Sequence, residues 1–365
     1  MSSELVSHET TAAFAPGLDE RVELLSIVYR LAGHPEFNSR PLTAYSRAVD
    51  RHFRQYAHHP FIAYVRGLNE TLARKGEEVG SWDVGSLALH LGVAATFDPL
   101  VPADDDGGRE GWDSRILLRP EMIAGLQQFY RDADCAEFFQ SQAAYFHAVN
   151  REVESRSVEP NAQWLEHFFA THPTETYTPV LSLLGGSDFG YVRVNFGHEL
   201  RNTHTIFALT RFDHRGLPTN LDYEAMARLG LHEGLHAYAN QLVDRNLEAL
   251  QPAAEALLAK PEVWSQVRET FYNNAPFLLR ESMVRAVAIK YTEENGGSSE
   301  ARARAIAAEE RAGFVWMGRL VEQLDYYEAN RGAFPNMLAF MAELIRFFNS
   351  QAGVTSAREL QRRPS

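Results

Sequence analysis

Apolar residues recur every three or four positions along most of this chain, and that spacing places them on one face of an α-helix. The first example joins Val22, Leu25, Val28 and Leu31, and Gly33 follows as a stop. The same pattern predicts helices in the first half of the chain over residues 41–57, 61–75, 81–91, 120–131, 133–154 and 161–170. In the last third it predicts helices over residues 252–258, 261–272, 276–293, 299–324 and 335–348.

The pattern changes between these two groups of helices. Short segments rich in β-branched and aromatic residues, separated by turn residues, predict strands over 177–184, 190–196 and 203–212. A further helix follows, with Asn220 or Asp222 as its N-cap and Gly230 as an interruption. The expected fold class is therefore α+β, predominantly α-helical, with one small sheet.

The helix after the sheet contains the string L-H-E-G-L-H-A-Y-A-N at residues 231–240. His232 and His236 are four residues apart, so on a helix both imidazoles lie on one face and can bind the same metal ion. Glu233 lies between them, where its carboxylate can take a proton from a water that the metal activates. This spacing is the H-E-x-x-H signature of zinc metallopeptidases, and it predicts one zinc ion per chain.

The residues around the motif favour a metal site over a chance match. The alternative is an amphipathic helix whose two histidines lie on a solvent-exposed face. Leucine and alanine surround the motif on nearly every side, so its histidines and glutamate are expected to be buried and to need partners. These apolar residues are Leu229, Leu231, Leu235, Ala237, Ala239 and Leu242.

The charge and cysteine content of the chain narrow the classes of partner. With 35 basic and 48 acidic residues, the formal net charge is −13, which argues against binding to nucleic acid or to an anionic membrane surface. The single cysteine, Cys135, cannot form a disulfide within the chain and is expected to be a small buried residue. A peptide or protein substrate is the expected partner, and the sequence does not predict an oligomeric state.

The start of the chain bears on localisation. It lacks the layout of a secretory signal, and no run of 18 apolar residues predicts a membrane span. We therefore expect a cytoplasmic protein, or a secreted or periplasmic one if the N-terminus is that of a trimmed mature form. The expected organisation is a disordered start over 1–17, a helical region over 18–171, a catalytic region over 172–350 and a tail over 351–365.

The order of elements is that of zincin peptidases, in which a small mixed sheet lies above the active-site helix, and a zincin-like fold is therefore expected. Most of the chain also resembles an uncharacterised bacterial group of gluzincin-like peptidases, classified as domain of unknown function 4932. Five strings carry this resemblance. They are E-L-L-S-I-V-Y-R-L-A-G at 23–33, H-H-P-F at 58–61, L-A-L-H-L at 87–91, H-E-G-L-H-A-Y-A-N at 232–240 and R-E-S-M-V-R-A at 280–286.

The resemblance implies a zinc-dependent hydrolase with Glu281 as the third metal ligand. The better-known gluzincins carry an aspartate four residues after this glutamate, where this chain has Arg285. The local sequence favours the same glutamate, because an unpaired carboxylate inside so apolar a helix would be strongly destabilising. Asp244 lies about 12 Å beyond His236 along its helix, too far to share the ion. The alternative is an ion pair of Glu281 with Arg280 or Arg285.

The predicted activity is hydrolysis of peptide bonds by a metal-activated water, with Glu233 as general base. A donor must also stabilise the oxygen that becomes negatively charged, and the candidates are Arg285, Tyr291 and the strand residue Tyr191. Arg285 has the alternative role of orienting Glu281. Two other functions stay open: a zinc-containing binding or regulatory protein, which would have no use for Glu233, and a zinc hydrolase of non-peptide amides.

Overall fold

The computed structural model describes residues 16–39, 42–77, 79–100, 119–157, 160–173, 175–185, 189–196, 200–219, 221–270 and 272–354. The chain forms two compact units, one from residues 1–160 and 176–230 and the other from residues 161–175 and 231–365. Each unit has its own buried hydrophobic core. Residues 1–15 and 355–365, which cover most of the two ends expected to be disordered, lie outside the described residues.

The N-terminal helices of the first unit surround one apolar core. In α1 (Glu20–Leu31) every residue from 22 to 29 is buried, so this helix passes through the core. Side-chain caps define where helices begin: Asp19 accepts a backbone hydrogen bond at the start of α1, and Thr43 does so at the start of α3 (Ala44–Phe53). The other described elements here are α2 (Pro35–Asn38), the 3-10 helix η1 (Arg54–Tyr56), α4 (Pro60–Arg74), α5 (Ser81–Leu89), α7 (Pro120–Asp132) and α8 (Cys135–Glu154).

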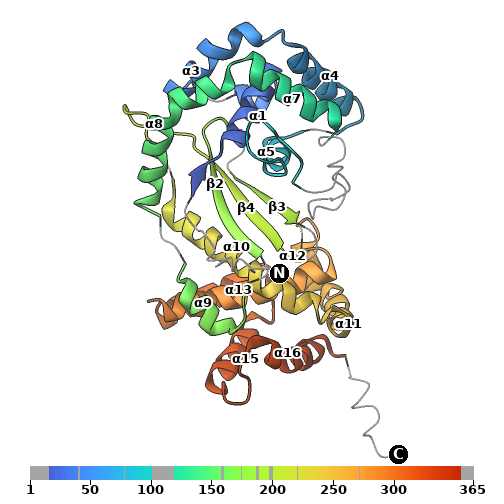
Figure 1. Ribbon diagram of the computed structural model, residues 1–365. Helices are drawn as coiled ribbons and strands as arrows, with labels where there is room; N and C mark the ends of the chain where they lie inside the picture. Colours follow the sequence, from blue (N-terminus) through green and yellow to red (C-terminus); the bar gives the residue numbers. More distant parts are fainter. Residues whose placement is uncertain are drawn as a thin grey trace, which may run out of the picture. The chain divides into compact units, whose positions relative to one another are not determined.

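A small mixed sheet completes the first unit, with the strand order β1-β2-β4-β3. The β1–β2 pair is parallel and the β3–β4 pair is antiparallel; β2, β4 and β3 lie side by side in Figure 1. Helix α5 approaches β4 closely, because a Cβ added at Gly85 would lie 2.2 Å from Cδ1 of Ile206. The predicted mixed sheet in a predominantly helical chain is confirmed. The strands are β1 (Gly17–Leu18), β2 (Glu175–Ser182), β3 (Phe189–Phe196) and β4 (Leu200–Ala208).

The second unit consists of helices packed around α13 (Ala275–Glu294), which has buried residues along most of its length. The indole N–H of Trp316 donates to the hydroxyl of Ser282 at 3.1 Å. The hydroxyl of Tyr327 donates to the carbonyl oxygen of Phe168 at 2.8 Å, which ties the N-terminal helix of this unit to its C-terminal part. The remaining helices are α9 (Ala162–Phe169), α10 (Tyr223–Asp244) from Leu231 onward, α11 (Leu247–Leu258), α12 (Pro261–Val267), α14 (Ser299–Arg311), α15 (Met317–Ala329) and α16 (Met337–Ala352) (Figure 1).

The single helix predicted over residues 299–324 was wrong, because the structure has two helices there. The chain turns at Gly313, whose φ of 105° is open to glycine but strained for other residues. The N–H of Gly313 donates to the carbonyl oxygen of Glu310 and that of Phe314 donates to the carbonyl oxygen of Glu309, as in a Schellman cap. The pattern missed this break because apolar residues continue at helical spacing on both sides of the glycine.

The boundaries of α10 and α11 also differ from prediction. Helix α10 runs without interruption through Gly230, because Leu229 before it and Leu231 after it both pack into apolar cores. Helix α11 begins at Leu247 instead of Pro252. The turn before the proline contributes the buried Leu250, and this packing offsets the backbone hydrogen bond that proline lacks.

The compact units do not follow the boundary predicted near residue 172, so the catalytic region expected over 172–350 needs correction. The sheet belongs to the first unit, because Val180, Leu181 and Ile206 join the core built by the N-terminal helices. The boundary instead lies inside α10, after Gly230. The sheet and the H-E-x-x-H motif therefore belong to different units.

Candidate metal centre

Helix α10 carries both histidines of the motif. It begins after Asp222, whose Oδ1 accepts a hydrogen bond from the N–H of Ala225 at 2.8 Å, which confirms Asp222 as the N-cap; Asn220 lies outside the described residues. The imidazoles of His232 and His236 are one turn apart, with 5.0 Å between ring centroids and 81° between ring planes. His236 is 9% exposed and the side chain of His232 is 22% exposed, so both rings are largely withdrawn from solvent.

A carboxylate from α13 meets these two imidazoles. Oε1 of Glu281 lies 3.2 Å from Nε2 of His236, and Oε2 lies 3.5 Å from Nε2 of His232. Glu281 is only 6% exposed. One candidate ligand atom from each of the three residues lies within 4.8 Å of the other two. The structure thus brings together the three ligands that were predicted, as a group that could hold a metal ion.

The donor atoms of this group suit zinc in both type and spacing. Two ligand atoms bound to tetrahedral zinc at roughly 2.0–2.1 Å lie about 3.3 Å from each other, close to the 3.2 and 3.5 Å found here. Nδ1 of His236 lies 3.0 Å from Oδ1 of Asn240, and because this oxygen only accepts, Nδ1 carries a hydrogen. In the neutral imidazole, Nε2 then carries the lone pair and is free to bind a metal.

Burial and local charge oppose each other in this cluster. Burial raises the pKa of Glu281, but hydrogen bonds with His232 and His236 and their charges outweigh it, so the pKa lies well below its ordinary value. Burial lowers the pKa of His236, but contact with Glu281 and the charge of Glu233 more than offset this, so the pKa is raised. The buried lone pairs of a carboxylate and an imidazole need a cation between them, which can be a proton or a metal ion.

Arg285, one turn after Glu281 on α13, contacts three groups at the edge of the cluster. Its Nε donates to Oε2 of Glu281 at 3.0 Å, its Nη1 to Oε2 of Glu309 at 2.6 Å, and its Nη2 to the hydroxyl of Tyr272 at 3.0 Å. The ion pair that was the alternative to a metal ligand is therefore present together with the histidine contacts. These three bonds favour the orienting role of Arg285 over contact with a substrate.

The motif glutamate, Glu233, is partly buried on α10 between the two histidines. Burial has the largest effect on the pKa of His236 and of Tyr272, and in both cases the negative charge of Glu233 contributes an upward shift. Glu233 directly follows His232 on α10 and is not one of the three residues in the candidate ligand group. A general base needs this kind of position.

Of the other two predicted donors, Tyr291 has a contact elsewhere in the second unit. Tyr291 is ten residues after Glu281, about 15 Å along the axis of α13, and its hydroxyl accepts a hydrogen bond from the N–H of Asn161 at 2.6 Å. The structure therefore does not bring Tyr291 to the cluster. Tyr191 lies on β3 opposite Thr205, and its side chain is outside the part of the chain that the structure describes.

Tyr272 and Glu309 were not predicted from the sequence. Tyr272 lies in the turn before α13, and Glu309 lies near the end of α14. Neither helical periodicity nor a motif relates these two residues to Glu281, so no pattern in the sequence singled them out. Both contact Arg285, which in turn contacts Glu281 of the candidate ligand group.

Other candidate groups do not compete with this cluster. Cys135 is buried, as predicted, and burial raises the pKa of its thiol to about 12, which disfavours a nucleophilic thiolate. Within the described ranges, no second group of three or more histidine, cysteine, aspartate and glutamate side chains is arranged to hold a metal ion.

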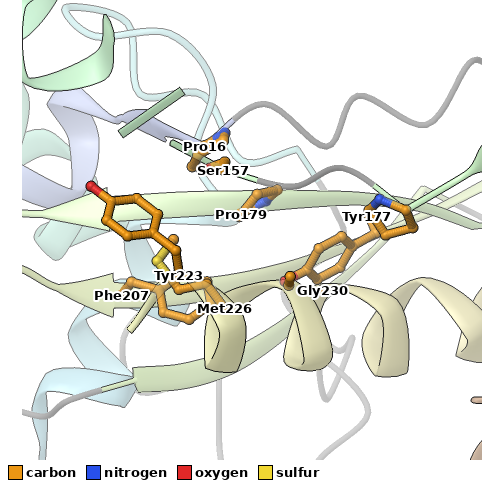
Figure 2. Close-up of a pocket in the computed structure, with 10 residues that line it drawn as sticks. Pro16, Ser157, Tyr177, Pro179, Phe207, Tyr223, Met226 and Gly230 are labelled. Carbon is orange, nitrogen blue, oxygen red and sulfur yellow. The ribbon is translucent and has the colours of Figure 1, made fainter. Parts of the chain in front are cut away.

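An apolar pocket lies in the first unit, where the first turns of α10 meet the sheet (Figure 2). Figure 2 shows Tyr223 and Met226 of α10 beside Phe207 of β4, with Tyr177 and Pro179 of β2 nearby. No carboxylate or imidazole is among the residues that line this pocket. It therefore offers no group for metal binding, and the histidine–glutamate cluster is the candidate site.

Comparisons with known proteins agree with the resemblance to domain of unknown function 4932 but assign no activity. A family model described as "Domain of unknown function (DUF4932)" matches residues 16–347. No curated protein and no solved structure gave a match. None of the helices in the described part of the chain is both long and apolar enough to cross a membrane. Any functional proposal must therefore come from the side chains of the cluster itself.

Proposed function

Because the chain belongs to this family, whose domain has no assigned function, we propose from its own side chains that it is a zinc-dependent hydrolase that cleaves peptide bonds. The observation that supports this proposal is the meeting of His232, His236 and Glu281, with the carboxylate of Glu233 close by. Catalytic zinc sites use three protein ligands and leave a position open. The zincin-like fold expected from the sequence is part of the same proposal.

Each residue of the motif has a defined task in this reaction. His232, His236 and Glu281 would hold the zinc ion, which polarises the carbonyl of the scissile bond and makes water acidic. Glu233 takes a proton from the water whose oxygen attacks the carbonyl carbon. As the C–N bond breaks, Glu233 returns that proton to the leaving nitrogen, so the carboxylate is regenerated. A purely structural zinc site has no need of this fourth residue.

Metal content and hydrolysis can be tested separately. The purified protein should bind about one zinc ion per chain, whereas His232→Ala and His236→Ala should each lose the metal. Glu233→Gln should keep the metal and lose about 10²–10⁴-fold in the rate of peptide cleavage, measured with a mixed peptide library. If Glu233→Gln cleaves as fast as the wild type, the enzymatic proposal is wrong. If the wild type binds zinc and cleaves only non-peptide amides, the substrate class is wrong.

The third ligand has a matched control on the same unit. Glu281→Ala removes a buried ligand and should lower zinc affinity sharply, as measured by competition with a chromogenic chelator. Glu269→Ala removes a carboxylate whose side chain is 83% exposed and should leave zinc affinity near that of the wild type. Full zinc retention in a folded Glu281→Ala protein would show that another group completes the site.

A further inference from the structure

The guanidinium of Arg285 is fixed by hydrogen bonds to three partners and by contacts with two aromatic rings. Its three nitrogens each donate to a different partner, and its central carbon lies 4.7 Å from the ring centroid of Phe314 and 5.0 Å from that of Tyr272. Its side chain is 17% exposed. This planar group therefore fixes several neighbours, among them the proposed ligand Glu281 and the phenol of Tyr272.

The direction of the bond between Arg285 and Tyr272 leaves the phenol with a hydrogen to donate. Arginine has no acceptor, so Nη2 donates and the hydroxyl oxygen of Tyr272 accepts, over 3.0 Å. The hydroxyl hydrogen is not used in that bond. A cation that donates to the oxygen also draws electron density from the O–H group, which strengthens its donation to an acceptor.

Arg285 links the phenol of Tyr272 to the proposed ligand, because its Nη2 contacts the hydroxyl of Tyr272 and its Nε contacts Oε2 of Glu281. Burial raises the pKa of Tyr272 most, the charge of Glu281 raises it further, Arg285 lowers it and Glu233 raises it again. One guanidinium thus holds both the phenol and the proposed ligand carboxylate. Because the net shift is upward, the hydroxyl stays protonated at neutral pH and can act as a donor.

We propose that Tyr272 is a catalytic residue that donates a hydrogen bond to the carbonyl oxygen on which negative charge develops, and that Arg285 is the residue that positions it. This inference rests on the proposed hydrolytic function. No covalent bond of Tyr272 forms or breaks: its O–H group stays intact and its hydrogen bond shortens as the charge grows. One donor of this kind contributes about 10²–10³-fold to rate in other enzymes.

A pair of small ligands tests the donor without a known substrate. Cobalt(II) replaces zinc as the metal, and its visible absorption reports ligands that reach the site. Inorganic phosphate carries negatively charged oxygens that can accept from Tyr272, whereas imidazole binds a metal through nitrogen and offers no such oxygen. Each ligand is titrated into the cobalt-loaded wild type, Tyr272→Phe and the control Tyr326→Phe, a tyrosine that is 49% exposed on α15.

We expect Tyr272→Phe to bind phosphate about 10- to 100-fold more weakly than the wild type, with unchanged affinity for imidazole and for cobalt. Tyr326→Phe should match the wild type in all three titrations. Equal phosphate affinity in Tyr272→Phe and the wild type would overturn the assignment of Tyr272, and so would a cobalt-loaded wild type that binds no phosphate. A wild type that binds no metal would overturn the proposed function, and the assignment with it.

The positioning role of Arg285 is tested by a double-mutant cycle. Arg285→Lys keeps the positive charge but cannot hold Tyr272 and Glu281 at the same time. It should weaken phosphate binding in the wild-type background and cause no further loss in Tyr272→Phe, because its effect passes through the phenol. An equal loss in both backgrounds would mean that Arg285 acts on the anion directly, and the positioning role would be wrong.

Discussion

At the scale of single residues, Asn240 shows how a side chain can orient a candidate metal ligand. It is 3% exposed and lies one turn after His236 on α10, with its Oδ1 3.0 Å from Nδ1 of the ring. This contact fixes the ring orientation and keeps the hydrogen on the nitrogen that points away from Glu281. The next residue along the helix, Gln241, instead donates to the carbonyl oxygen of His172.

This difference gives a prediction with a neighbouring control. Asn240→Ala should lower zinc affinity about 10- to 100-fold, because the imidazole loses the partner that orients it. Gln241→Ala should leave the affinity near that of the wild type. Zinc affinity is measured by chelator competition, with circular dichroism to verify the fold. Wild-type affinity in Asn240→Ala would mean that packing alone orients His236.

At the scale of elements, the turn between α14 and α15 supplies two contacts of Arg285. Glu309, near the end of α14, accepts from Nη1, and Phe314, just after the turn, lies over the guanidinium. In one continuous helix, residues five positions apart would point about 140° away from each other. Both could not then contact the same guanidinium. The helix break at Gly313 is therefore part of the construction of the site.

The conformation of this turn predicts that replacing Gly313 lowers the stability of the protein. Gly313→Ala should destabilise the protein by about 1–3 kcal/mol, because alanine is strained at a φ of 105°. The added Cβ would also lie 3.0 Å from Cβ of Gln266. Gly332→Ala is the control, since a Cβ there would meet nothing within 4 Å. Chemical denaturation measures both, and equal stability of the two variants would contradict the strain assigned to Gly313.

At the scale of the whole molecule, a buried carboxylate in the first unit couples stability to pH. Glu23 of α1 is 0% exposed, and its Oε1 accepts hydrogen bonds from the N–H of Leu183 at 2.6 Å and the hydroxyl of Ser182 at 3.1 Å. Burial raises its pKa from 4.5 to about 7, although these bonds partly lower it. The carboxyl group of Glu23 therefore connects α1 to the end of β2, and the free energy of unfolding depends on whether this group is protonated.

The sign of this dependence follows from the raised pKa. The contribution of Glu23 to the free energy of unfolding is fully present below pH 4.5 and is lost as the pH rises through 7. The reason is that Glu23 loses its proton at a lower pH in the unfolded chain than in the folded protein. A shift from 4.5 to about 7 corresponds to at most about 3 kcal/mol. Urea unfolding of Glu23→Gln should show a smaller loss of stability than the wild type between pH 5 and pH 8, with the exposed-site variant Glu269→Gln as control. Parallel pH profiles for wild type and Glu23→Gln would exclude this role.

The sequence by itself determined those features that depend on local geometry. A helix sets the distance between residues four apart, so the spacing of His232 and His236 was enough to place both imidazoles on one face. The Asp222 cap and the predominance of helices are local in the same sense. Glu281 could be named because a carboxylate within an apolar helix needs a partner, and the nearby acids were too far away or too exposed.

Only the tertiary structure decided which distant residues surround that site. Tyr272 and Glu309 reach Arg285 from a turn and from another helix, and the contact depends on how those segments pack. The position of the unit boundary inside α10 likewise depends on how segments pack. Periodicity tells which face of a segment is buried but not what covers it, because the covering residues are chosen by packing between segments with no fixed separation in the sequence.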